Sequence, residues 1–199
     1  MKRNAKPPEI RKQELIAAAL KLFSEKGYED TSVRDILNAV GGEVGMFYHY
    51  FKSKDEIFEL SIAYFMEQYA SECSAICKSN TDSFLQSIDR LIAFQYETMK
   101  TYKAIWSGKI HWSMVSAIYK KTVESIIPYV EGLINKAAER NEISINPGAL
   151  NIHEVTLFLV YGISGVLHEK PMVKISLEEL SEKQKSIQSL VRQIITLKG

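Results

Sequence analysis

Apolar residues recur along this chain at the three- and four-residue spacing of α-helices, and no stretch alternates with the two-residue period of a strand. The first such segment covers residues 9–26. It follows Pro7 and Pro8, and proline suits the first turn of a helix. Gly27 stands where a left-handed glycine cap would end that helix. The pattern therefore predicts an all-α protein whose first helix ends at this glycine.

Two short amphipathic segments follow, one over residues 32–40 and one ending near Phe51, and Gly41 and Gly42 separate them. Apolar residues of the first segment fall on one helical face, which we expect to be buried. Two short helices joined by a glycine-containing turn form the helix-turn-helix pattern. The second helix of that pattern enters the DNA major groove. We therefore expect residues 32–51 to form a DNA-binding motif.

Capping signals mark the helices of the rest of the chain. Ser-x-x-Glu or Ser-x-x-Gln boxes open helices at Ser53, Ser83 and Ser176, and Asn146 with Pro147 opens another. A short helix is expected around 104–107, and a mid-helix proline, Pro128, is expected to kink a long helix over 113–139. The total is about nine helices. The predicted organisation is a basic flexible tail (1–8), a helix-turn-helix DNA-binding domain (9–54) and an effector-binding and dimerisation domain (55–199).

Composition and charge limit the possible functions. Of the 199 residues, 46% are hydrophobic and 25% are charged, as in ordinary soluble globular proteins. No apolar run approaches the roughly 20 residues that a membrane span needs. The charged N-terminal residues lack the apolar core of a secretory signal, so we expect a cytoplasmic protein with no membrane partner. Residues 1–54 hold ten Lys and Arg against seven Asp and Glu, which suits a domain that meets phosphate.

The sequence offers no site for catalysis or for a metal ion. Cys73 and Cys77 lie four residues apart on one helical face, without the further ligands that a zinc site needs, so we expect them to be packed in the interior. A nucleophile elbow, a phosphate-cradling glycine loop and a zinc signature are all absent. We therefore expect no enzyme activity, no metal and no cofactor.

A known signature fits the second helix of the motif. The run from Gly45 to Lys54, GMFYHYFKSK, closely resembles the G-T-x-Y-x-H/Y-F-x-S/N-K signature of TetR-family transcriptional regulators. The preceding stretch matches the same family at Phe23, Gly27, Tyr28, Thr31, Val33, Ile36 and Gly41. The resemblance covers roughly residues 9–69. The chain departs from the family pattern at positions that affect the operator rather than the fold: Gly42, Glu43, Val44 and Met46.

The residues of the motif and this resemblance predict the DNA-binding surface. The second helix packs Phe47 inward, which leaves Tyr48, His49 and Lys52 to reach phosphates and base edges. The hydroxyl of Thr31 or Ser32 either caps the first helix or holds a phosphate, since helix N-termini favour anions. The predicted DNA-binding residues are Thr31, Ser32, Arg34, Glu43, Val44, Gly45, Met46, Tyr48, His49, Lys52 and Lys54.

Aromatic and sulfur-containing residues concentrate in the middle of the predicted effector-binding and dimerisation domain. Pockets for small ligands are mostly apolar and aromatic with a few polar groups, and the resemblance implies an effector pocket in this region. We expect the pocket to take a flat or elongated apolar molecule, although any one of these aromatics, taken singly, is more often core. The expected lining residues are Phe94, Gln95, Met99, Tyr102, Trp106, His111, Trp112, Phe158 and Tyr161.

The last two helices are the expected dimer interface. The helix before Glu169 is apolar all round, and Gly162 and Gly165 would let another helix approach closely. The resemblance implies the same homodimer; the alternative is that these helices complete the core of a monomer. The predicted function is a ligand-responsive regulator, in this family usually a repressor, that leaves a palindromic operator when a small apolar effector binds. The alternative is a protein-binding adapter that has lost operator recognition.

Overall fold

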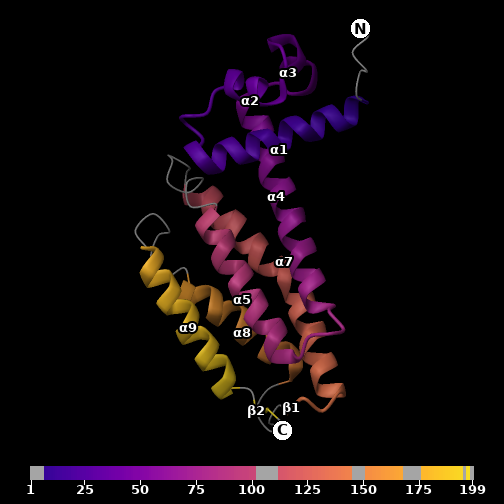
Figure 1. The fold of residues 1–199 in the computed structure, drawn as a ribbon, viewed down its shortest axis with the longest axis vertical. Coiled ribbons are helices and arrows are strands. Elements are labelled where there is room, and N and C mark those ends of the chain that lie inside the picture. The colour runs from indigo at the N-terminus through magenta and orange to yellow at the C-terminus, as the bar shows by residue number, and fades with distance from the viewer. Residues whose placement is uncertain (1–6, 102–111, 145–150, 168–175, 195, 198–199) are drawn as a thin grey trace. The chain divides into compact units, whose positions relative to one another are not determined.

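The computed structural model describes residues 7–101, 112–144, 151–167, 176–194 and 196–197. Eight helices, labelled as in Figure 1, form nearly all the regular structure of this described part. They are α1 (Pro8–Lys26), α2 (Val33–Val40), α3 (Val44–Tyr50), α4 (Lys54–Cys77), α5 (Phe84–Thr101), α7 (Trp112–Glu139), α8 (Ile152–Leu167) and α9 (Leu177–Ile194). The prediction of an all-α fold that begins with a helix-turn-helix is confirmed.

The chain divides into two compact units, and the division falls inside α4. The first unit contains the described residues up to Gln68 and residues 112–114, and in its core phenylalanines pack among aliphatic side chains. Phe23 and Phe58 meet edge to face with ring centroids 5.3 Å apart, and Phe47 lies 5.4 Å from Phe51. All four rings are buried. Because helices as short as α2 and α3 are marginal alone, this core is what fixes them.

The second unit contains the end of α4, from Tyr69 on, together with α5, α8, α9 and most of α7. In Figure 1, α9 (yellow) lies against α5 and α8, and both contacts are extensive. No described helix combines the length and the apolar character that a membrane crossing needs. The buried core of this unit is mainly aliphatic and includes Ile88, Ile92, Val123, Ile126, Val130, Ile134, Leu159, Val160, Leu167, Ile187 and Val191.

Reciprocal caps begin two helices of the second unit. The Ser83 amide donates to the Gln86 side chain at 2.8 Å, and the Gln86 amide donates back to the Ser83 hydroxyl at 3.4 Å, so the predicted box exists. Asn151 and Glu154 form an equivalent pair before α8. Such pairs satisfy amides that a helix start leaves without partners.

Two findings differ from the sequence prediction or lie beyond it. Beside the predicted helices, the described residues contain one pair of short strands, β1 (Ile143–Ser144) and β2 (Thr196–Leu197), which pair antiparallel. Two-residue strands are too short to show an alternating pattern in sequence. The predicted helix around 104–107, the N-cap at Asn146-Pro147 and most of the basic tail lie outside the described residues.

Candidate nucleic-acid interface and body cavity

The first helix of the motif, α2, begins with a reciprocal cap between Ser32 and Asp35. The Asp35 amide donates to the Ser32 hydroxyl at 3.2 Å, and the Ser32 amide donates to the Asp35 carboxylate at 2.8 Å. The hydrogen bonds from Ser32 lower the pKa of Asp35 below its usual value. The carboxylate therefore stays charged beside the positive end of the helix dipole, where it is favourable. Of the two predicted caps, Ser32 is the one used.

Gly41 and Gly42 form the turn between α2 and α3. Gly41 has a φ of 65°, the left-handed conformation that favours glycine, and its amide donates to the Asn38 carbonyl at 3.3 Å. A β-carbon added at Gly42 would lie only 1.8 Å from the terminal methyl carbon of Met46. The end of the flexible Met46 side chain therefore lies against Gly42 and would have to move for a larger residue there.

Helix α3 turns Phe47 inward and presents a mostly apolar outer face. Phe47 is fully buried, whereas Val44 is 51% and Tyr48 is 60% exposed. Gly45 and His49 are exposed as well. The helix contains no Arg, Lys, Asn or Gln. It therefore lacks the guanidinium and amide groups that bind guanine or adenine through two hydrogen bonds.

Most residues predicted to contact DNA are accessible in the first unit. The exposed ones are Ser32, Arg34, Glu43, Val44, Gly45, Tyr48, His49 and Lys52, and Met46 is half-buried. The remaining two, Thr31 and Lys54, turn their polar groups into the protein.

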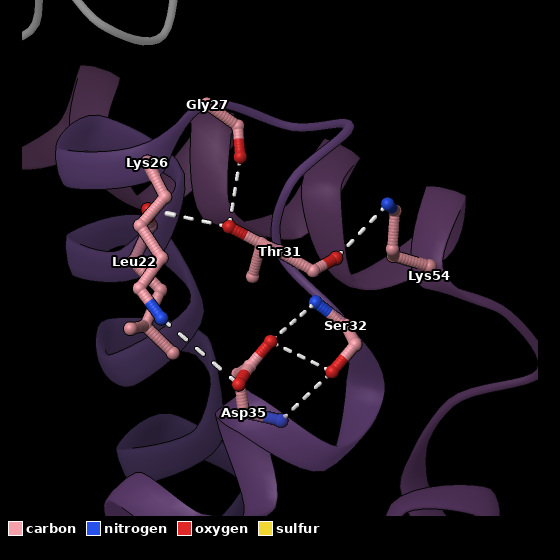
Figure 2. A network of polar contacts seen from close by, with 7 residues as sticks. All are labelled: Leu22, Lys26, Gly27, Thr31, Ser32, Asp35 and Lys54. Carbon is pink, nitrogen blue, oxygen red and sulfur yellow. Dashed lines mark hydrogen bonds and ion pairs between the residues drawn. The ribbon is translucent and has the colours of Figure 1, made fainter.

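Thr31 is a structural residue of the loop between α1 and α2. Its side chain is only 1% exposed. Figure 2 shows its hydroxyl between two carbonyls: it is 2.8 Å from the Gly27 oxygen and 3.3 Å from the Leu22 oxygen at the end of α1. The prediction that this side chain binds phosphate is corrected, because its hydroxyl is enclosed and already bonded.

Lys54, the first residue of α4, also directs its charged group inward. Its ammonium donates to the Tyr28 carbonyl at 2.7 Å and to the Thr31 carbonyl at 3.0 Å, the second bond being drawn in Figure 2. It also lies 4.1 Å from the centroid of the Tyr28 ring. The ammonium is thus bonded within the protein in this arrangement, and a phosphate contact at Lys54 stays a prediction.

Two more contacts hold the motif, and sequence patterns did not predict them. The Tyr28 hydroxyl donates to the Asp55 carboxylate, and burial together with this bond raises the pKa of Tyr28. Arg11 on α1 donates to the Val40 carbonyl at 3.3 Å, which places a cation at the C-terminal end of α2. Both pairs join residues nearly thirty positions apart, and no local pattern reports such a separation.

A small cavity of about 40 Å³ lies inside the second unit. It is smaller than the cavity of about 150 Å³ that holds benzene in a known engineered protein, so in this form it has space for only a few water molecules. Among the described residues its wall carries no charged side chain. The lining consists of Tyr69, Cys73, Ile88, Leu91, Ile92, Gln95, Ile126, Val130, Leu159, Val160, Ile163 and Val191.

Two residues of the predicted pocket lie at or beside this cavity. Gln95 lines the cavity, and the Phe94 ring is 5.3 Å from that of Tyr69, which also lines it. Met99 is buried elsewhere in the core. Tyr102, Trp106 and His111, as well as the side chain of Trp112, lie outside the described residues.

The other two predicted pocket residues are on the surface. Phe158 is 60% and Tyr161 is 44% exposed, so their assignment to the pocket is wrong. They occupy the outer face of α8, which its neighbours in the chain do not cover. Val166 on α8 and Leu190 on α9 are exposed too. Gly162 and Gly165 leave open space beside α8, because a β-carbon at either would meet nothing within 4 Å.

The two cysteines are free, buried thiols. Burial raises the pKa of Cys73 to about 12, with a further contribution from Cys77, and burial raises the pKa of Cys77 to about 11. Both therefore stay protonated and unreactive near neutral pH. This agrees with the expectation that they pack in the interior, and Cys73 contributes to the cavity wall.

Comparisons with known proteins agree with this geometry. Residues 15–60 match the model of the family described as bacterial regulatory proteins, tetR family. The HTH-type transcriptional repressor KstR2 of Rhodococcus jostii is 33% identical over 89 residues, 45% of this chain and 43% of that protein. The biofilm operon icaADBC negative regulator IcaR of Staphylococcus aureus is 34% identical over 86 residues, 43% of this chain and 44% of that protein. The chain thus spans less than half the length of these two relatives.

Solved structures match the fold over nearly the whole chain. A transcriptional regulator from Cytophaga hutchinsonii has a TM-score of 0.76 at 20% identity, covering 94% of this chain and 98% of its own. Reduced NemR of E. coli has a TM-score of 0.71 at 14% identity, covering 94% and 98%. Similarity at these identities concerns the fold alone. The family model and the relatives describe transcriptional regulators and not enzymes. Over residues 15–60 the chain matches the DNA-binding domain of the TetR family of bacterial regulatory proteins, and its helical fold is that of solved transcriptional regulators.

Proposed function

We propose that this protein is a DNA-binding transcriptional regulator that acts as a homodimer and represses its target genes. It would leave DNA when a small uncharged ligand enters the second unit. One observation carries the proposal: the outer face of α3 is exposed, while its inner face is fixed in the core of the first unit. A helix held in this way fits the DNA major groove. Repression is supported by the names of two relatives, a repressor and a negative regulator.

Most of the proposed phosphate contacts flank α3, and one of them, His49, lies on it. Arg34 on α2 and Lys52 just after α3 are exposed cations, and Ser32 and His49 add exposed polar groups. Contacts of this kind set the orientation of a protein on the duplex without reading its sequence. Thr31 is not part of this proposed surface, and Lys54 stays a predicted contact.

The proposed base contacts are unusual in their chemistry. Val44 and Tyr48 are the large exposed side chains of α3, and apolar groups recognise the methyl group of thymine. The exposed carboxylate of Glu43, at the start of α3, would accept a hydrogen bond from the amino group of cytosine. Without arginine, lysine or an amide on α3, the helix would select bases through thymine methyl groups and a cytosine donor.

The proposed dimer uses the uncovered face of α8 together with α9. Phe158, Tyr161 and Val166 on α8 and Leu190 on α9 are exposed apolar side chains. Clusters of this kind on a surface indicate a protein interface. Dimerisation would present two copies of α3 to half-sites about 34 Å apart, one helical turn of DNA.

The proposed ligand site is the cavity of the second unit. Its wall is apolar apart from Gln95, Tyr69 and Cys73, so a neutral apolar molecule with one hydrogen-bonding group would suit it. Because the cavity holds only about 40 Å³, such a ligand requires the surrounding helices to move apart. The ligand would then bind the expanded form more tightly than the compact one, which is the condition for shifting an equilibrium between two states.

The experiment that tests the proposal is selection of duplexes from a random DNA pool by the purified protein. The expected result is a palindromic sequence with two half-sites, bound selectively and more weakly as salt rises. The selected duplex is then used to screen neutral aromatic and aliphatic molecules for release of the protein. If no sequence is enriched and binding to every duplex is equally weak, the protein is not a sequence-selective regulator, and the adapter alternative would take its place.

A further inference from the structure

The outer face of α3 places a hydrogen-bond acceptor beside an apolar surface. Glu43, Val44 and Tyr48 are all exposed. Glu43 directly precedes Val44, and Val44 and Tyr48 lie four residues apart, so these two side chains are neighbours on the helix. The residues at the start of such a helix are the ones that reach base edges in the major groove. A base that meets this part of α3 would therefore meet a carboxylate and an apolar surface together.

The Glu43 carboxylate has no partner within the described part of the chain. It stands at the N-cap position of α3 but does not bond the amides of the first turn, and no described ion pair or hydrogen bond involves its side chain. Near DNA, an unpaired carboxylate is repelled by the phosphates. A hydrogen-bond donor on a base would offset this repulsion. The amino groups of cytosine and adenine are the donors that the major groove offers to such an acceptor.

The apolar surface beside this carboxylate is fixed in place. The Tyr48 ring meets the buried Phe47 ring edge to face, with centroids 5.3 Å apart. Gly45, which follows Val44, is exposed, and a β-carbon there would meet nothing within 4 Å. A base can therefore come close to the helix backbone next to Val44 and Tyr48. A methyl group in the major groove would contact these two side chains.

One base presents an amino donor and a methyl group side by side in the major groove. Thymine has the methyl group, but beside it lies the O4 acceptor, which a carboxylate repels. Cytosine and adenine have the amino donor and no methyl group. In N6-methyladenine the remaining N–H is used to pair with thymine. In 5-methylcytosine the amino group keeps one N–H free for the groove, and the methyl group is on the next ring carbon.

We propose that Glu43, Val44 and Tyr48 form a recognition surface for 5-methylcytosine, so that methylation of one cytosine in each half-site strengthens DNA binding. Glu43 accepts the hydrogen bond from the amino group, and Val44 and Tyr48 contact the methyl group. This proposal rests on the proposed function, which places α3 in the major groove. It assigns the donor and the methyl group to one modified base, whereas unmodified DNA offers them only on separate base pairs.

The test is selection from two random DNA pools, one with ordinary cytosine and one with 5-methylcytosine throughout. We expect both pools to yield a palindromic sequence and the methylated duplex to bind more tightly. Duplexes with a single methylated cytosine then locate the effect. Methylation at one position of a half-site should raise affinity about fourfold, the effect of burying one methyl group. Replacing that base with thymine keeps the methyl group but removes the donor, so affinity should fall roughly tenfold.

Two variants separate the two contacts. Val44→Ala should lose most of the gain from methylation and keep the preference for 5-methylcytosine over thymine. Glu43→Gln, whose amide can also donate to the thymine O4 atom, should lose that preference and keep most of the gain. Glu59→Gln on α4 is the matched control, because this carboxylate is exposed but is not part of the proposed surface. It should behave like the wild-type protein.

Three results would overturn the proposal. Equal affinity for methylated and unmethylated duplexes at every cytosine would exclude it and leave the proposed function in place. A gain that persists undiminished in Val44→Ala would come from a change in DNA shape rather than from a contact, and would exclude it as well. If the wild-type protein enriches no sequence from either pool, the proposed function fails together with this proposal.

Discussion

The Thr31 hydroxyl donates a hydrogen bond of 2.8 Å to the carbonyl oxygen of Gly27 in the interior of the first unit. The two residues bracket the loop between α1 and α2, and Gly27 is the C-cap of α1. The same hydroxyl lies 3.3 Å from the Leu22 carbonyl. The Thr31 side chain therefore links the two ends of this loop inside the protein. We expect its replacement to change the stability of the fold rather than the contacts to DNA.

Replacing Thr31 with valine should destabilise the protein while leaving its DNA contacts in place. Valine has a similar shape but no hydroxyl, so buried carbonyl groups lose a partner, at a cost of about 1–3 kcal/mol. Urea unfolding measures this loss. Thr101→Val, at the exposed end of α5, is the matched control and should change stability by less than about 0.5 kcal/mol. Normal stability with a large loss of DNA affinity would instead indicate a phosphate contact at Thr31.

Replacing thymine with uracil in the selected duplex should weaken binding without removing any base-pair hydrogen bond. The two bases differ by the methyl group that Val44 and Tyr48 are proposed to contact. Burying one such group contributes about 0.8 kcal/mol, or roughly fourfold in affinity. Titration of duplexes substituted at one thymine at a time measures the effect.

The control for this experiment is the variant Val44→Ala. Without the valine methyl groups, the protein should distinguish thymine from uracil less well at the positions that Val44 contacts. An affinity that is unaffected by uracil at every position would exclude the methyl contacts.

Replacing Gly162 with leucine should disrupt the dimer without disturbing the monomer fold. A β-carbon at Gly162 would have open space around it, so a side chain fits the monomer but separates two closely packed helices in a dimer. Sedimentation velocity across a range of concentrations measures the change. Gly132→Leu is the matched control, because Gly132 is an equally open glycine on α7. If both variants remain dimeric, the interface lies elsewhere.

Raising the pH should destabilise the protein because of its two buried thiols. Their pKa values are raised from an ordinary value of 9.0 to about 12 at Cys73 and about 11 at Cys77. Since the folded state holds these protons more tightly than the unfolded state, their stabilisation is complete below pH 9 and is lost as pH rises toward 11–12. Denaturant unfolding from pH 8 to 11 measures the loss, and the variant Cys73→Ala/Cys77→Ala should lose less over the same interval.

Local patterns predicted the helices well and the polar contacts of the first unit only in part. The boundaries of α1 to α5 could be read from apolar spacing and from caps such as Ser32 and Ser83, because these signals act within four residues. The inward roles of Thr31 and Lys54 could not. Each depends on hydrogen bonds to backbone carbonyls of the 27–32 loop. Every residue type has a backbone carbonyl, so the sequence does not indicate which carbonyls accept these bonds.

The pocket prediction failed at Phe158 and Tyr161 for a different reason. On a helix that is apolar all round, the sequence does not show which side faces the core of its own chain. The buried side of α8 carries Leu159, Val160 and Leu167, and the aromatic pair lies on the other side. The cavity itself is formed mainly by aliphatic residues of five helices, which no aromatic cluster in the sequence could indicate.

The absence of lysine and arginine from α3 has a consequence for how binding responds to the ionic environment. Lysine and arginine side chains that contact phosphates release counterions from DNA. In this protein all such side chains would lie outside α3, the helix that distinguishes the bases. Added salt would then weaken binding to every sequence by a similar factor and leave the ratio between correct and incorrect sites nearly constant. In a cell under osmotic stress, such a regulator would lose occupancy at all its sites together while keeping its order of preference among them.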